Sequence, residues 1–321
     1  VQESDVMRTH RVGIGLYKVD GDKGVRTHHV KVDIEGARTE VPELAGIDHD
    51  LALVNDEDLT YCKMRLTPGH TEFVLEHIGQ IEDPLARTLC WSSLWEAVRD
   101  TLLPARKFVM AVANFSRLED QPSVQERLLA QATLAVKQYV AWSWQRTGFY
   151  MLSEAFRGQE PAGIYQRALA RLQPSKQNTT YFHELLQSLD NQEIRWLVLT
   201  NLAAGGAMLA KTAKNEEDPS SEGALSRLRI DAVTNKQWAW DEIVSGTRTN
   251  LEVRFLIDGL TFTSEGMDGL AERYFEIAPE LWDKLTNEMA QNTLEGLFPL
   301  WDISIATVER AEALLAREDI P

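Results

Sequence analysis

Part of a zinc-binding motif occurs once in the sequence. His183 and Glu184 begin the pattern H-E-x-x-H of metallopeptidases, but Gln187 stands where the second histidine belongs. Zinc bound by this motif needs two imidazoles one helical turn apart, and a glutamine amide is a poor substitute. We therefore interpret Glu184 as a carboxylate on a helix surface.

The other histidines do not form a predicted metal site either. His28 and His29 are consecutive in a predicted strand, so their side chains leave opposite faces. His70 and His77 lie about 10 Å apart along a predicted helix, which is too far to share one ion. We interpret these side chains as surface or interfacial histidines.

Glycines and carboxylates add no recognisable chemistry. The sequence has no phosphate-binding glycine loop and no nucleophile elbow, and Gly205 and Gly206 simply follow a predicted helix. Acidic residues are scattered over helix starts and polar faces. The sequence therefore predicts no catalytic, cofactor-binding or metal-binding residue in this chain, and it leaves the residues of any substrate cavity unknown.

Composition and charge restrict the classes of partner. The 321 residues carry a formal net charge of −16, which disfavours nucleic acid and anionic membranes because both need a basic face. No apolar run reaches the length of about 18 residues that a membrane span requires. Cys62 and Cys90 are predicted to be buried free thiols, which favours a reducing, cytoplasmic location. Val1 stands where a natural start has Met, so we expect a fragment of a longer protein.

Residues 1–66 alternate between apolar and polar side chains with a period of two. The clearest strands contain Val12, Ile14 and Leu16, and then Val30, Val32 and Ile34, with a hairpin turn at residues 20–24. Further short strands are predicted at 38–41, 51–54 and 61–66. These strands predict a small antiparallel β-sandwich domain.

Residues 67–321 instead show the helical period of 3.6 throughout. About twelve to fifteen helices are predicted, and helix pairs recur as in a HEAT- or armadillo-like superhelix. The clearest helix covers residues 190–206: Asp190 with Glu193 resembles a capping box, and Arg195 and Asn201 are expected to lie off its apolar stripe. The charged stretch 211–223 is predicted to be an exposed, mobile loop. The predicted fold class is mainly α, with the small β domain first.

Several stretches together resemble the C-terminal region of bacterial aminopeptidase N, particularly that of actinobacterial members. That region comprises the end of a β-sandwich and an ERAP1-like helical domain. No single motif is diagnostic, but the order and spacing of the matching stretches are collectively specific. They are residues 11–17 (RVGIGLY), 56–66 (DEDLTYCKMRL), 81–95, 195–196, 273–275, 288–291 and 297–299.

The resemblance implies a zinc metalloaminopeptidase whose catalytic residues lie outside this chain. The family uses H-E-x-x-H with a distant Glu, a G-x-M-E-N loop and a Tyr, and residues 206–208 copy only the first three letters of that loop. The implied role is a non-catalytic fragment that caps the active-site cleft and shapes substrate access. Zinc is then expected in the full-length parent, and the implied partners are an upstream catalytic domain and peptide substrate, with no nucleic acid and no membrane.

Two segments could contact substrate if the resemblance holds. Residues 259–265 (GLTFTSE) depart from the pattern of relatives, so the resemblance implies no cavity contact for this segment. Arg248 could face substrate, although a solvated Arg in a helix-capping loop is the simpler interpretation. The alternative function is a free-standing α-solenoid adaptor that binds a protein or peptide on its concave face; an independent enzyme with an unusual site has little support. Peptide preference and oligomeric state are left open.

Overall fold

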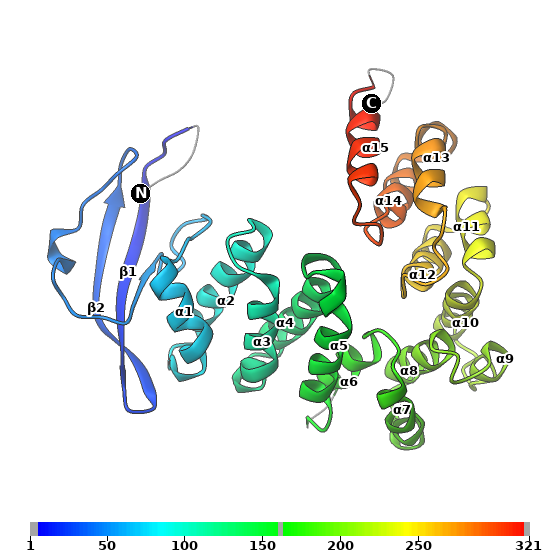
Figure 1. The fold of residues 1–321 in the computed structure, drawn as a ribbon, viewed down its shortest axis with the longest axis horizontal. Coiled ribbons are helices and arrows are strands. Elements are labelled where there is room, and N and C mark those ends of the chain that lie inside the picture. Colours follow the sequence, from blue (N-terminus) through cyan, green and yellow to red (C-terminus); the bar gives the residue numbers. More distant parts are fainter. Residues whose placement is uncertain (1–5, 160–162, 318–321) are drawn as a thin grey trace. The chain divides into compact units, whose positions relative to one another are not determined.

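The computed structural model describes residues 6–159 and 163–317 (Figure 1). The chain divides into two compact units, residues 1–165 and 166–321, and each is described by itself. The predicted division at residues 66 and 67 marks the change from strands to helices, because β3 ends at Val54 and α1 begins at Pro68. As a domain boundary it stays a prediction.

The first unit begins with a three-stranded antiparallel sheet. Its strands are β1 (His10–Asp20), β2 (Lys23–Ile34) and β3 (Leu51–Val54), in the order β2-β1-β3. The predicted hairpin is confirmed: the turn between β1 and β2 contains Gly21 at φ +63°, a conformation that glycine adopts at no steric cost.

Two of the predicted strands are wrong. Residues 38–41 form a loop that leads into the 3-10 turn Pro42–Leu44, and residues 61–66 carry no strand pairing within the described parts of the chain. Alternating side chains indicate two faces of different polarity, but a strand also needs a backbone partner that the local pattern does not specify. The described residues of the first unit thus provide one layer of the predicted sandwich.

Helices build the rest of the first unit. They are α1 (Pro68–His77), α2 (Pro84–Arg99), α3 (Ala105–Phe115), α4 (Pro122–Leu134), α5 (Trp142–Phe156) and α6 (Gly163–Ala170), which runs on into the second unit. Two of these helices begin at residue types that commonly cap a helix N-terminus. Thr67 and Asp83 accept hydrogen bonds from the first free backbone amides of α1 and α2, and each is followed by proline.

The second unit is helical throughout its described residues. Alternate helices pack on one another in succession, with α8 on α10, α10 on α12 and α12 on α14, as expected for stacked helix pairs. The mainly α fold is therefore confirmed. The helices are α7 (Lys176–Ser188), α8 (Gln192–Ala204), α9 (Ala210–Ala213), α10 (Ser221–Thr234), α11 (Lys236–Ser245), α12 (Asn250–Leu260), α13 (Leu270–Lys284), α14 (Asn287–Leu297) and α15 (Ile305–Leu315).

Helix α8 differs from its prediction at both ends. Its cap is Asn191, whose Oδ1 accepts the Ile194 amide at 3.0 Å, while Glu193 pairs with Arg167 instead of closing a capping box. Asn201 is buried, not off the apolar stripe, and its amide donates to the carbonyl oxygens of residues 170 and 172. A buried amide is tolerated there because it satisfies carbonyls at the end of the neighbouring helix.

The charged stretch 211–223 is more firmly attached than predicted. Arg195 donates to Glu216 at 2.6 and 3.0 Å, and the Trp196 indole donates to Asp218 at 2.8 Å. Arg227 donates to three backbone carbonyls of the stretch. Glu216 and Asp218 are therefore used in contacts with α8, whereas Glu217 and Glu222 are exposed as predicted.

Candidate functional site

The predicted fragment of a zinc motif lies on a helix surface. His183 and Glu184 are exposed on α7, which confirms the interpretation of Glu184 as a surface carboxylate. Within residues 6–159 and 163–317 no group of three His, Cys, Asp or Glu side chains is placed to hold a metal ion. The described residues therefore do not fit a catalytic zinc site.

Two of the histidines make a contact with each other that the sequence did not reveal. The rings of His49 and His70 lie 5.6 Å apart between centroids, and both are half-buried. Burial, and then the nearby His49, hold the pKa of His70 below its ordinary value. The pair joins a loop to α1 across 21 positions of sequence, so no local pattern could have identified it.

The two segments singled out in the second unit make internal contacts. Arg248 pairs with Glu242 at 2.6 Å and with Glu252 at 3.2 Å in the loop that caps α12, and its side chain stays 29% exposed. In the segment 259–265, a Cβ on Gly259 would lie 2.4 Å from the Arg229 carbonyl oxygen. Glycine is therefore required there for the close approach of α10 and α12.

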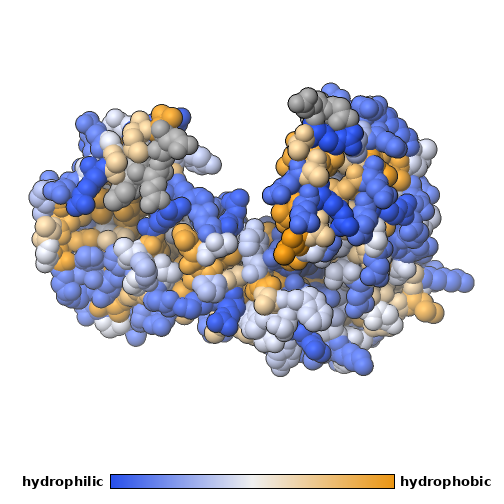
Figure 2. All heavy atoms as spheres, turned by 45° about the horizontal axis from the view of Figure 1, so that its top comes forward, coloured by the Kyte–Doolittle hydropathy of each residue, from blue (hydrophilic) through white to orange (hydrophobic). Residues whose placement is uncertain are grey.

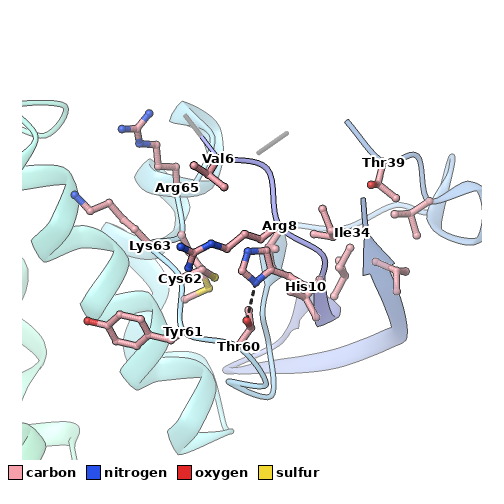
Figure 3. Close-up of a pocket in the computed structure, with 16 residues that line it drawn as sticks. Val6, Arg8, His10, Ile34, Thr39, Thr60, Tyr61, Cys62, Lys63 and Arg65 are labelled. Atoms are coloured by element: carbon pink, nitrogen blue, oxygen red, sulfur yellow. Dashed lines mark hydrogen bonds between the residues drawn. The ribbon is translucent and has the colours of Figure 1, made fainter. Parts of the chain in front are cut away.

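A groove on the sheet of the first unit has the character of a binding site (Figure 3). We call it the sheet groove; its volume is about 710 Å³, within the usual range for ligand sites of roughly 300 to 1,000 Å³. The strands contribute mainly apolar side chains from one face. The lining residues are Val6, Arg8, His10, Val12, Ile14, Val32, Ile34, Thr39, Val41, Val54 and residues 60–65.

Strand register explains the apolar floor of the sheet groove. Val12 lies opposite Val32 across β1 and β2, and Ile14 lies opposite Val54 across β1 and β3. Alternate residues of a strand share one face, so these side chains gather on the same side of the sheet. Val54 remains 39% exposed although it belongs to this apolar face. Figure 2 shows hydrophobic atoms reaching the surface in the part of the view that holds the sheet.

A buried ion pair closes the opposite face of the sheet. The Asp56 carboxylate accepts from the Tyr17 hydroxyl at 2.5 Å and from Arg26 at 2.7 Å, and its side chain is fully buried. Burial, and then the bond to Asp56, raise the pKa of Tyr17. A Cβ on Gly15 would lie 2.3 Å from the Asp56 carboxylate, so the glycine makes room for the pair. Tyr17 and Asp56 are thus buried on this face, whereas Ile14, Val32 and Val54 on the apolar face are only partly buried or exposed.

Residues 60–65 form the rim of the sheet groove. His10 is hydrogen-bonded to Thr60 at 2.9 Å, and Lys63 reaches α2, where its ammonium lies 2.8 Å from Asp100 and 3.3 Å from Glu96. The hydrogen bond from Lys63 holds the pKa of Asp100 below its ordinary value. Arg8, Lys63 and Arg65 give this rim basic side chains in an otherwise acidic chain (Figure 3).

The prediction that both cysteines are buried is wrong for one of them. Both thiols are free, but Cys62 is exposed at this rim and only Cys90 is buried. Burial raises the pKa of each thiol, most strongly for Cys90, so both favour the unreactive protonated form.

A three-stranded sheet followed by stacked helix pairs, with no metal-ligand cluster among the described residues, defines a helical-repeat region joined to a β layer. The sequence model of the ERAP1-like C-terminal domain matches residues 51–321. Aminopeptidase N of Streptomyces lividans is 32% identical over a 338-residue alignment, which covers 97% of this chain and 39% of that protein. The chain belongs to the ERAP1-like C-terminal domain family and represents the C-terminal part of an aminopeptidase N family protein.

The chain thus spans well under half the length of the relative that it matches. The family model begins at residue 51, so β1 and β2 lie outside it, whereas the alignment with the Streptomyces protein covers nearly the whole chain. None of the described helices is long and apolar enough to cross a membrane.

Proposed function

We propose that this chain is the non-catalytic C-terminal region of a zinc-dependent aminopeptidase that removes N-terminal residues from peptides. The observation that carries the proposal is the alignment of 97% of the chain with 39% of an aminopeptidase N. Zinc and its ligands then belong to the rest of the full-length protein, because the described residues here offer no ligand set.

The test compares residues 1–321 alone with the full-length protein. We expect hydrolysis of aminoacyl-arylamides and stoichiometric zinc in the full-length protein only, with the activity abolished by a chelator. Chelator-sensitive turnover by residues 1–321 alone would refute the non-catalytic assignment.

A second element of the proposal is that the helices cap the active-site cleft and limit substrate access. It is supported by family membership and by stacked helix pairs, which commonly provide extended binding surfaces. The partners are then a catalytic domain in the same chain and the peptide substrate. A cytoplasmic location completes the proposal and is supported by two free thiols.

A further inference from the structure

Two histidine rings join the loop before β3 to the first turn of α1. His49 lies two residues before Leu51, where β3 begins, and His70 is the third residue of α1. The ring centroids are 5.6 Å apart, the ring planes are tilted by 53°, and both side chains are half-buried. Helix α1 also packs against β3 itself. The two rings therefore lie at the junction between the sheet and the first helix.

A hydrogen bond fixes the neutral form of one ring. His49 Nδ1 lies 2.8 Å from the carbonyl oxygen of Ile47, and a carbonyl oxygen only accepts, so Nδ1 carries the proton. In neutral His49 the Nε2 atom is then an unprotonated acceptor. Protonation of Nε2 at lower pH gives this ring a full positive charge beside His70.

The acidic groups of the loop already have other partners. Asp48, the neighbour of His49, pairs with Lys18 of β1. Asp50 accepts the backbone amide of Val19 at 2.8 Å. Neither carboxylate forms an ion pair with a histidine ring within the described parts of the chain. Protonation of the rings therefore adds no ion pair in the loop.

The surroundings of His70 on α1 also disfavour a positive charge. Glu72 is bonded to Lys107 of α3 at 2.6 Å, and β3 and the 3-10 turn Ile78–Gln80, which both pack against α1, carry no ionisable side chain. His70 lies in the first turn of α1, where the helix dipole presents its positive end. Burial, and then His49, hold the pKa of His70 below its ordinary value. Burial, the second ring and the helix terminus thus all favour the neutral imidazole.

We propose that the contact between His49 and His70 is a pH-sensitive switch that attaches the loop before β3 to α1 and releases it in acid. When both rings are neutral they pack against each other. When both are protonated, two like charges separated by about the centroid distance of 5.6 Å repel in a partly desolvated site. The switch is independent of the proposed function, because both rings and their neighbours lie in the first unit.

The direction of the pH dependence follows from the lowered pKa of His70. The folded protein binds fewer protons at this ring than the unfolded chain does. The contact therefore stabilises the junction above the ordinary histidine pKa of about 6.5, and this stabilisation is lost as pH falls through the lowered value.

Hydrogen exchange of the full-length protein, measured by mass spectrometry at pH 7.5 and pH 5, tests the switch. Residues 45–50 report on the loop, because the amides of Ile47 and Asp50 are hydrogen-bonded to the carbonyl oxygens of Leu44 and Tyr17. After correction for the intrinsic pH dependence of exchange, we expect the protection of these amides to fall at least about tenfold at pH 5. Equal protection at the two pH values would overturn the proposal.

Two substitutions assign the fall in protection to the rings. His70→Phe keeps an aromatic ring on α1 that cannot be protonated. His49→Asn keeps a donor near the Ile47 carbonyl without an ionisable group. The protection of residues 45–50 should then be equal at pH 7.5 and pH 5 in each variant. A tenfold fall that persists in both variants would overturn the proposal.

The matched control is His77→Phe. His77 is on the same helix, but its ring stacks on Phe73 at 4.9 Å between centroids and not on another histidine. This variant should show the same fall in protection as the wild type. Loss of the pH dependence in His77→Phe as well would assign it to a general effect of histidines on α1 and would contradict a switch at His49 and His70.

Discussion

At the scale of single residues, the sheet depends on one glycine that makes room for a buried charge. A Cβ at position 15 would lie 2.3 Å from Asp56 Oδ2 and 2.7 Å from its Cγ. Displacing this carboxylate would separate it from Tyr17 and Arg26, and an unpaired buried charge is costly. Gly15→Ala should therefore lower the free energy of unfolding by about 2 to 4 kcal/mol.

Urea unfolding followed by circular dichroism measures this difference. Gly69→Ala is the control: Gly69 lies in the first turn of α1 and a Cβ there meets no atom within 4 Å. Its substitution should be neutral or slightly stabilising, because alanine favours helix. Similar losses from both substitutions would show that the Asp56 pair is not the cause.

A buried lysine provides a second prediction at this scale. Lys236 is 8% exposed, and its ammonium donates to the carbonyl oxygens of Gly259, Leu260 and Thr263 at the end of α12. Lys236→Met keeps much of the side-chain volume but leaves those carbonyls without this donor. Thermal and urea unfolding should show a loss of about 1 to 3 kcal/mol. An unchanged stability would mean that water replaces the ammonium.

At the scale of elements, the contact between α8 and the stretch 211–223 should depend on pH. The hydrogen bond from Arg195 lowers the pKa of Glu216, so the folded protein binds fewer protons there than the unfolded chain. The stabilisation is therefore present above the ordinary glutamate pKa of about 4.3 and is lost as pH falls through the lowered value. Arg195→Met should cost about 1 to 3 kcal/mol at neutral pH and progressively less in acid.

Unfolding of the wild type, Arg195→Met, Glu216→Gln and the double variant, each at several pH values, completes this test. The coupling energy between the two positions should shrink as Glu216 becomes protonated. A coupling that is constant from neutral pH to pH values well below 4 would contradict the assignment to this ion pair.

The ion pairs of Lys63, which attach residues 61–64 to the end of α2, also belong to this scale. Lys63→Met removes the contacts with Asp100 and Glu96, so these residues should become more susceptible to proteolysis in the chain alone. Lys107→Met is matched to it, because Lys107 is similarly exposed and pairs with Glu72 between α3 and α1. Cleavage near residue 63 should increase only in the first variant, and high salt should reduce the difference between the two proteins.

The same elements show how far sequence patterns can predict this protein. The mainly α class and the hairpin follow from local periodicity and turn residues. The missing strand at 61–66 and the buried Asn201 do not, because each depends on a partner distant in sequence. The cap at Asn191 is a local contact with Ile194, but Asp190 beside it offers the same kind of acceptor, so the local pattern does not distinguish the two. For the same reason the sheet groove was not predicted: its apolar residues were recognised as a strand face, but periodicity does not show whether a second layer covers that face.

At the scale of the whole molecule, net charge becomes the relevant property. The chain carries −16 formal charges, and a surface of one sign attracts oppositely charged ligands over distances set by ionic strength. If this region borders the route of peptides to a zinc site, basic peptides should reach the full-length enzyme faster than acidic peptides of equal length. The difference in kcat/KM should be about tenfold at low salt, and it should largely disappear near 1 M salt, where the Debye length is about 3 Å.

Peptides that share one N-terminal residue and differ only in distal Lys or Glu residues allow this measurement. An aminoacyl-arylamide with the same N-terminal residue is the control, because it is too short to extend toward the helices and should respond little to salt. Removal of acidic side chains from this region of the full-length enzyme should reduce the preference for basic peptides without changing arylamide hydrolysis. A preference that is independent of salt would instead assign selectivity to direct contacts in the catalytic part, and the helices would then support that part without guiding substrate.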